Sequence, residues 1–237
     1  MIGDAPQPGL IEGGRLGETG LLDDLLVDDG LLLTTGEPCH GPYDRPMPQD
    51  PSKDALRLAV LSARELVTAA DWAAEDASRT AALLAIADRM TPGTVALYAS
   101  RPGEPGTDAL LDGFTARGWD ILLPVIAKRV YWARLEPETE LVVGWGGIPQ
   151  PAGSRLPAEA LAEATLIVAP CLALGEDLTR LGTGGGWYDR ALLHRSPAAP
   201  VVALTREAEL LPTVPVEPHD QRVDGYVTEH RSVLVDR

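Results

Sequence analysis

The chain has 237 residues, a formal net charge of −15 and a hydrophobic share of 45%, which fits one sizeable domain with or without an extra arm. The negative charge disfavours non-specific nucleic-acid binding, because the phosphate backbone would meet a repulsive field. No apolar run is long enough to span a bilayer and no secretory signal opens the chain, so we expect a cytoplasmic protein without a membrane partner.

The first 51 residues differ in composition from the rest of the chain. They are rich in Gly, Pro and Asp, and five prolines fall between Gly36 and Pro51. Proline removes a backbone donor and fixes φ, so no long helix or strand is expected there. We predict a poorly ordered arm over residues 1–51 and a folded domain over residues 52–237.

The first half of that domain is predicted to alternate helices with short apolar strands. A helix begins after the N-cap Ser52, and a second helix covers residues 71–90 before the stop at residues 91–93. A strand at 94–98, a helix at 108–117 and a strand at 120–126 follow.

The second half is less regular at first and then resumes the alternation. Residues 130–135 and 140–145 are predicted to form a hairpin. A short helix at 157–163, a strand at 164–169, a helix at 188–194 and strands at 200–204 and 223–228 complete the pattern. Short apolar strands alternating with helices predict an α/β fold, with a mainly parallel sheet covered on both faces in three Rossmann-like layers. Ligands of such sheets usually bind at the carboxyl edge of the strands.

A glycine-rich segment from Arg180 to Arg190 is the most informative part of the chain. Four of the five residues from Gly182 to Gly186 are glycine. They remove side chains that would block an anion and permit positive φ angles, so backbone N–H groups can converge on a phosphate. Arg180 and Arg190 can neutralise that phosphate, and Asp189 offers a carboxylate for Mg²⁺. The segment is neither a Walker A motif nor a dinucleotide fingerprint, and a flexible surface turn is the alternative interpretation.

The same segment resembles the signature of the 5-formyltetrahydrofolate cyclo-ligase family. Other segments resemble that family in the same order, and they span about residues 53–230: Lys53-x-x-x-Arg57, Tyr98-Ala99-Ser100 with Glu104-Pro105-Gly106-Thr107, Ile148-Pro149-Gln150-Pro151, His219-Asp220 and Val227-Thr228-Glu229. The resemblance implies an ATP- and Mg²⁺-dependent ligase that converts 5-formyltetrahydrofolate to 5,10-methenyltetrahydrofolate. ADP and phosphate are released because the formyl oxygen is phosphorylated on the way.

The resemblance also implies a role for each matching residue. The implied ATP-binding residues are Lys53, Arg57, Arg180, Gly182, Thr183, Gly184, Gly185, Gly186, Tyr188 and Arg190, with Tyr188 and Arg190 also catalytic. The implied folate-binding residues are Ala99, Glu104, Trp145, Gln150 and Trp187, and the implied metal ligands are Asp189 and Asp220. The partners implied are the folate and ATP, and we expect a monomer.

Simpler interpretations and departures from the family pattern leave alternatives open. Lys53 and Arg57 lie four residues apart, as a solvated surface pair on a helix would. Gln150 stands where the family usually has Glu, and Leu174-Gly175 where it commonly has Phe-Asp. The first alternative is therefore a non-catalytic folate- or nucleotide-binding paralogue, and the second is another small-molecule kinase or ligase with the same loop.

Overall fold

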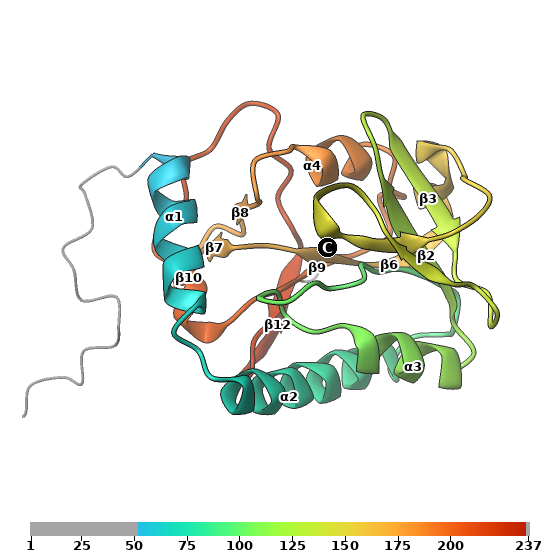
Figure 1. The fold of residues 1–237 in the computed structure, drawn as a ribbon, viewed down its shortest axis with the longest axis horizontal. Coiled ribbons are helices and arrows are strands. Elements are labelled where there is room, and N and C mark those ends of the chain that lie inside the picture. The colour runs from blue at the N-terminus through green and yellow to red at the C-terminus, as the bar shows by residue number, and fades with distance from the viewer. Residues whose placement is uncertain (1–51, 236–237) are drawn as a thin grey trace, which may run out of the picture. The chain divides into compact units, whose positions relative to one another are not determined.

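Two helices open the part of the chain that the computed structural model describes, residues 52–235 (Figure 1). Helix α1 covers Lys53–Arg64, and the Ser52 hydroxyl accepts a hydrogen bond from the Ala55 amide at 3.2 Å, which confirms the predicted N-cap. Helix α2 covers Ala69–Ala87, two residues earlier at its start than expected, because Thr68 provides its cap. The arm predicted over residues 1–51 lies outside the described residues.

A seven-stranded sheet in the order β12-β11-β9-β6-β1-β2-β3 forms the centre of the described domain. Its strands are β1 (Thr94–Ala96), β2 (Asp120–Ile126), β3 (Val130–Arg134), β6 (Ala164–Pro170), β9 (Val201–Leu204), β11 (Gly225–Val227) and β12 (Ser232–Leu234). The five inner strands pair in parallel, and the two edge strands β3 and β12 are antiparallel. This mixed but mainly parallel sheet confirms the predicted fold class.

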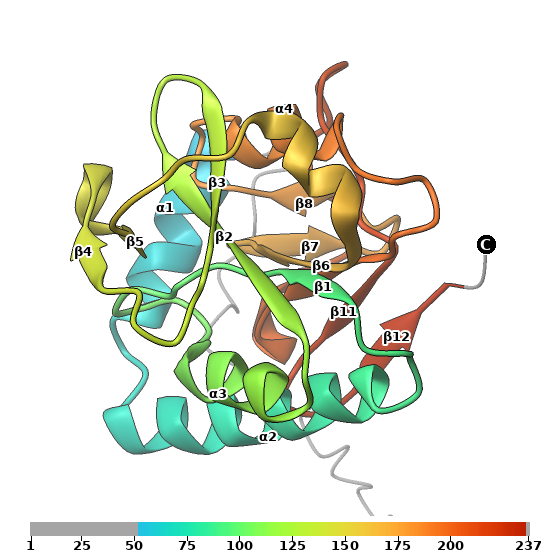
Figure 2. The same ribbon diagram turned by 90° about the vertical axis from the view of Figure 1, so that its right-hand side faces the viewer.

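Helices cover both faces of this sheet (Figures 1 and 2). Helices α2 and α3 (Asp108–Ala116) lie on one face, and α4 (Trp187–Leu192) lies on the other. Successive residues of β6 point to opposite faces of the sheet. Leu166 and Val168 pack in the apolar cluster with α2 and α3, whereas Ile167 and Ala169 pack in the cluster with α4. The inner strands β1 and β9 are buried at every position, as expected for parallel strands that are covered on both faces.

The predicted hairpin between residues 130–135 and 140–145 is wrong. Strand β3 pairs with β2 instead, across the three residues 127–129, and β4 (Leu141–Val143) pairs with β5 (Pro149–Pro151). The short connection after Ile126 permits an immediate antiparallel return. That return buries Trp132 completely.

A small sheet that the sequence did not predict lies beside α1. It consists of β10 (Leu210–Leu211), β7 (Ala173–Gly175) and β8 (Arg180–Leu181). Leu56 and Val60 of α1 pack against Ala173 and Leu181 in a third apolar cluster. The single-turn 3-10 helices η1 (Trp145–Gly147) and η3 (Glu207–Glu209) and the longer η2 (Ala158–Glu163) complete the elements. This packing fixes the glycine-rich segment, which follows β8, next to α1.

None of the helices within residues 52–235 combines the length and the apolar character that crossing a membrane requires.

Candidate active-site cleft

A cleft lies where the strand order of the main sheet reverses. From β1 the chain passes to β2 on one side of β1, and it then passes to β6 on the other side. The loops that leave the carboxyl ends of β1 and β6 therefore diverge and open a crevice, which is where ligands of such sheets bind. Tyr98 and Ala99 after β1 line this cleft, as do Cys171 and Leu172 after β6.

Most of the residues singled out in the sequence come together in this cleft. They are Lys53, Arg57, Ala99, Glu104, Trp145, Arg180, Gly182, Thr183, Gly184, Gly185, Gly186, Trp187, Tyr188, Asp189 and Asp220. They come from segments more than 160 residues apart in the chain, as the bond between Lys53 and Asp220 shows. The glycine-rich segment, the start of α1 and the Glu104 loop therefore face one common cavity.

The glycine-rich loop between β8 and α4 bends through two left-handed residues. Gly184 has φ +99° and Gly186 has φ +59°, a region that side chains strongly disfavour. A Cβ at Gly184 would lie 3.4 Å from Cζ of Arg57, and Nε of Arg57 donates to the carbonyl of Gly182 at 2.9 Å. The loop backbone is thus bare toward the cleft and lies against a cation from α1.

Lys53 is neutralised by two carboxylates in the cleft. Its Nζ lies 2.6 Å from Oδ2 of Asp220 and 2.9 Å from Oε2 of Glu217. Burial alone would lower the pKa of Lys53, but its hydrogen bonds to these carboxylates outweigh burial and raise the pKa. Burial would likewise raise the pKa of Asp220, but Lys53 and the Glu217 amide lower it below its ordinary value.

Arg180 and Asp189 form a second ion pair at the base of the glycine-rich loop. Nη2 of Arg180 lies 2.9 Å from Oδ1 of Asp189, and the Arg180 side chain is only 4% exposed. The same Oδ1 accepts a hydrogen bond from the amide of Gln221 at 3.1 Å. Since Gln221 follows Asp220 in the chain, this bond ties the two predicted metal ligands to neighbouring positions.

The hydroxyl of Tyr188 is a buried polar group of a residue that lines the cleft. It has no hydrogen-bond partner among the described residues. Burial raises the pKa of this phenol well above its usual range; the nearby Arg180 opposes the rise and Glu104 adds to it. The hydroxyl therefore stays protonated and can donate to an acceptor atom placed in the cleft.

The loop that carries Glu104 also lines the cleft. Nε of Arg101 lies 2.9 Å from Oε1 of Glu104, and Nη1 of Arg101 donates to the carbonyl of Gly146 at 3.1 Å. Trp145, which precedes Gly146, lines the cleft while 73% exposed. An aromatic ring is therefore presented beside a carboxylate, an arrangement that suits a flat heteroaromatic ligand.

Carboxylates at one end of the cleft can hold a divalent cation. Within the described part of the chain, Glu217, His219 and Asp220 offer ligand atoms that all lie within 4.8 Å of one another. Asp189 is not in this group but lines the same cleft. Oxygen ligands from one or two acidic side chains are what Mg²⁺ takes at nucleotide sites, so the donor set fits that ion.

Two predicted site residues do not line the cleft. Oε1 of Gln150 accepts a hydrogen bond from the amide of Ile126 at 3.0 Å and so ties β5 to the end of β2. Arg190 is exposed and donates from Nη1 to the carbonyl of Gly185 at 3.1 Å. Their predicted contacts with ligands stay predictions.

Sequence reasoning missed several residues that do line the cleft, among them Arg64, Tyr98, Arg101 and Cys171. Arg101 carried a local signal, since it lies three residues before Glu104 in the same turn. Arg64 and Cys171 carried none, because only the packing of α1 against β7 and β8 brings them to the cavity. Burial raises the pKa of the Cys171 thiol to about 11, so this group is no thiolate nucleophile at neutral pH.

Comparison with known proteins identifies relatives of the chain over this whole domain. Residues 49–229 match the model of the 5-formyltetrahydrofolate cyclo-ligase family. A protein of Mycolicibacterium smegmatis named 5-formyltetrahydrofolate cyclo-ligase is 36% identical over 193 residues, which cover 78% of this chain and 98% of that protein. A protein of the same name from Escherichia coli K12 is 29% identical over 140 residues, 57% of this chain and 77% of its own length.

Solved structures agree with these relatives. The structure of Aquifex aeolicus 5,10-methenyltetrahydrofolate synthetase matches with a TM-score of 0.67 at 25% identity, over 78% of this chain and 93% of that one. The synthetase from Mycoplasma pneumoniae matches with a TM-score of 0.61 at 19% identity, over 75% of this chain and 98% of that one, and supports the fold.

Proposed function

The chain belongs to the 5-formyltetrahydrofolate cyclo-ligase family, and we propose that it converts 5-formyltetrahydrofolate to 5,10-methenyltetrahydrofolate with ATP and Mg²⁺, releasing ADP and phosphate. The observation that carries this proposal is the common cleft. The bare glycine-rich loop, Lys53 and Glu104 all line it, so a triphosphate and a pterin can be held side by side. We also propose that the protein acts as a cytoplasmic monomer.

The nucleotide side of the cleft would be formed by the glycine-rich loop and the cations around it. Backbone N–H groups from Gly182 to Gly186 would bind the phosphates, with Lys53, Arg57 and Arg180 neutralising them. In the structure Lys53 pairs with Asp220 and Arg180 pairs with Asp189. A nucleotide with its cation can replace both sets of partners at once, which keeps every charge compensated.

Asp189 and Asp220 would hold the magnesium ion, since both line the cleft near the glycine-rich loop. When bound, the ion would neutralise the charge that develops on the transferred phosphoryl group. Glu217 lies beside Asp220 and could act as a third oxygen donor or through a water molecule.

For the proposed reaction the main task of the protein is to hold the two substrates in line, and acid–base catalysis is secondary. An amide oxygen leaves poorly, so the formyl oxygen first attacks the γ-phosphorus of ATP and ADP departs. N10 of the folate then attacks the activated carbon, the carbon–oxygen bond breaks, phosphate leaves with that oxygen, and the N10 proton is lost. The protonated Tyr188 hydroxyl would donate to an oxygen at the junction of the two substrates, and Glu104 would hold the folate ring nitrogens.

The departures from the family pattern do not favour the non-catalytic alternative. Leu174 is fully buried in the core, and neither Leu174 nor Gly175 lines the cleft. Gln150 makes its own structural hydrogen bond outside the lining. The substituted positions therefore leave the walls of the cavity intact.

An absorbance assay for methenyltetrahydrofolate tests the proposal directly. Purified protein is mixed with 5-formyltetrahydrofolate, ATP and Mg²⁺, and parallel reactions omit each component in turn. Product should form only in the complete mixture, with one ADP released per product. Absence of product at stoichiometric enzyme, with folate binding intact by calorimetry, would support the binding paralogue instead.

A further inference from the structure

Arg64, the last residue of α1, is buried at the floor of the cleft and has no role in the proposed chemistry so far. It is 4% exposed yet lines the cavity. Its guanidinium forms a fork with Glu209, with Nε 2.6 Å from Oε1 and Nη2 2.8 Å from Oε2. Glu209 is completely buried, and it also accepts bonds from the Thr205 hydroxyl and the Arg206 amide, both at 3.1 Å. The charge of Arg64 is therefore compensated and its plane is fixed.

The two remaining bonds of Arg64 reach across the cleft floor to two different loops. Nη1 donates to the carbonyl of Gly103 at 3.0 Å, and Nη2 donates to the carbonyl of Cys171 at 3.0 Å. Gly103 directly precedes Glu104, whereas Cys171 lies at the start of the segment that leads through β7 and β8 into the glycine-rich loop. One side chain thus joins the Glu104 loop to the segment that leads into the glycine-rich loop, at the point where the sheet order reverses.

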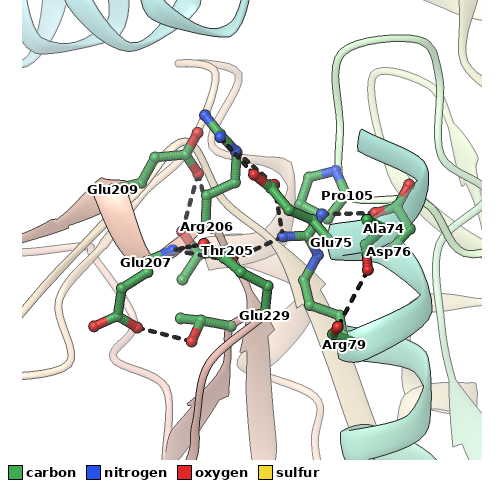
Figure 3. Close-up of polar contacts among 12 residues, drawn as sticks. Ala74, Glu75, Asp76, Arg79, Pro105, Thr205, Arg206, Glu207, Glu209 and Glu229 are labelled. Carbon is green, nitrogen blue, oxygen red and sulfur yellow. Dashed lines mark hydrogen bonds and ion pairs between the residues drawn. The ribbon is translucent and has the colours of Figure 1, made fainter. Parts of the chain in front are cut away.

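A second polar network holds the other end of the Glu104 loop. Oδ1 of Asp76 accepts a bond from the Gly106 amide at 2.8 Å and another from Nη2 of Arg79 at 2.7 Å. The network continues from Arg79 to Glu75, whose carboxylate accepts two hydrogen bonds of 2.7 Å from Arg206 (Figure 3). The loop around Glu104 is therefore held on both sides, by Asp76 of α2 at Gly106 and by Arg64 at Gly103.

Stability alone does not account for such an arrangement. A buried ion pair is seldom more stable than an apolar pair of similar volume, because both charges lose their hydration. A planar group with several donors in fixed directions, however, defines the relative position of the groups that accept from it.

We propose that Arg64 is a positioning residue for the cyclo-ligase reaction, which sets the spacing between the Glu104 loop and the glycine-rich loop, and that Glu209 holds it in place. This inference rests on the proposed function. Its basis is that a reacting group displaced by about 1 Å can lose about 100-fold in rate. Arg64 acts through the two loops and not on the reacting atoms.

The test compares Arg64→Lys and Glu209→Gln with the wild-type protein and with Leu83→Val, a destabilising control. Leu83 is fully buried in the apolar cluster with α2 and α3 and does not line the cleft. Lysine keeps the charge but cannot fork to Glu209 while reaching both carbonyls. Glu209→Gln provides a second variant if Arg64→Lys does not fold.

Hydrogen exchange without ligands and steady-state kinetics at 25 °C are the two measurements. We expect amides of residues 101–106 to exchange about tenfold faster in both site variants and kcat to fall about 10- to 100-fold, with the Kd of ATP unchanged within about twofold. Leu83→Val should lower the unfolding temperature with neither effect.

The inference is overturned if either site variant keeps the wild-type kcat, if exchange at residues 101–106 is unchanged, or if Leu83→Val lowers kcat equally. Hydrogen exchange requires no turnover, so it tests whether Arg64 holds the Glu104 loop even if the wild-type protein makes no product. A wild-type protein without product rejects the proposed function separately.

Discussion

Replacing Asp189 by asparagine tests the ion pair and the proposed metal ligand with one change. Oδ1 of Asp189 accepts from Nη2 of Arg180 at 2.9 Å and from the Gln221 amide at 3.1 Å. Asparagine keeps the shape and an acceptor for Gln221, but it removes the negative charge opposite an arginine side chain that is 4% exposed. The change therefore isolates the charge.

The contacts of Asp189 set the expected loss of stability and the expected loss of turnover. A hydrogen bond to a charged group contributes about 1.5–3 kcal/mol, so Asp189→Asn should lose stability of that order. At about 2–4 °C per kcal/mol for a chain of this size, the unfolding temperature should fall by about 3–12 °C. Loss of a magnesium ligand should lower kcat by about 100-fold or more, which corresponds to about 2.7 kcal/mol of barrier.

Thermal unfolding and the methenyltetrahydrofolate absorbance assay measure the two effects, with Asp88→Asn as the matched control. Asp88 also pairs with an arginine, Nε of Arg117 at 2.7 Å, but at the surface and away from the cleft. The control should leave unfolding and turnover nearly unchanged. Wild-type turnover in Asp189→Asn would refute the metal role, and an unchanged unfolding temperature would refute the energetic argument for the ion pair.

Further predictions concern the glycine-rich loop, Trp145, the pH dependence of stability and the residues before Pro51. Gly184→Ala should cost about 1–2 kcal/mol because φ is +99°, whereas Gly185→Ala should not, because no atom lies within 4 Å of the position that its methyl group would take; equal unfolding temperatures would contradict the strain argument. Trp145→Ala should barely change stability, because the ring is 73% exposed, but should raise KM for the folate about two- to thirteenfold, since an aromatic stacking pair contributes about 0.5–1.5 kcal/mol; an unchanged KM would remove Trp145 from the site. The pKa of Asp220 is lowered from its ordinary value of 3.8, so the stabilising contribution of this carboxylate is present above that pH and is lost as pH falls through the folded-state pKa. The free energy of unfolding measured in urea should therefore fall more steeply between pH 5 and pH 3 in the wild type than in Asp220→Asn, and equal slopes would argue against the pairing with Lys53. A chain that begins at Pro51 should keep wild-type turnover, and complete loss of activity would show that the preceding residues are required.

The sequence determined the local elements and the class of the fold. Ser52 and the spacing of Leu56 and Val60 predicted the start of α1, because capping and helical periodicity act over a few residues. Apolar strands alternating with helices predicted a mainly parallel sheet, because such strands must be buried on both faces. The glycine pattern from Gly182 to Gly186 likewise predicted a backbone without side chains at a site for an anion.

The tertiary structure decided which distant residues meet. The pairing of β3 with β2 depended on the tight turn at 127–129 and on the burial of Trp132, so the predicted hairpin was wrong. The small sheet of β7, β8 and β10 is built from strands of two or three residues, too short to leave a periodic pattern. Lys53 meets Asp220, and Arg64 meets Glu209, only because α1 packs on that small sheet. Contacts between residues about 150 positions apart depend on how the whole chain packs, and no local propensity encodes them.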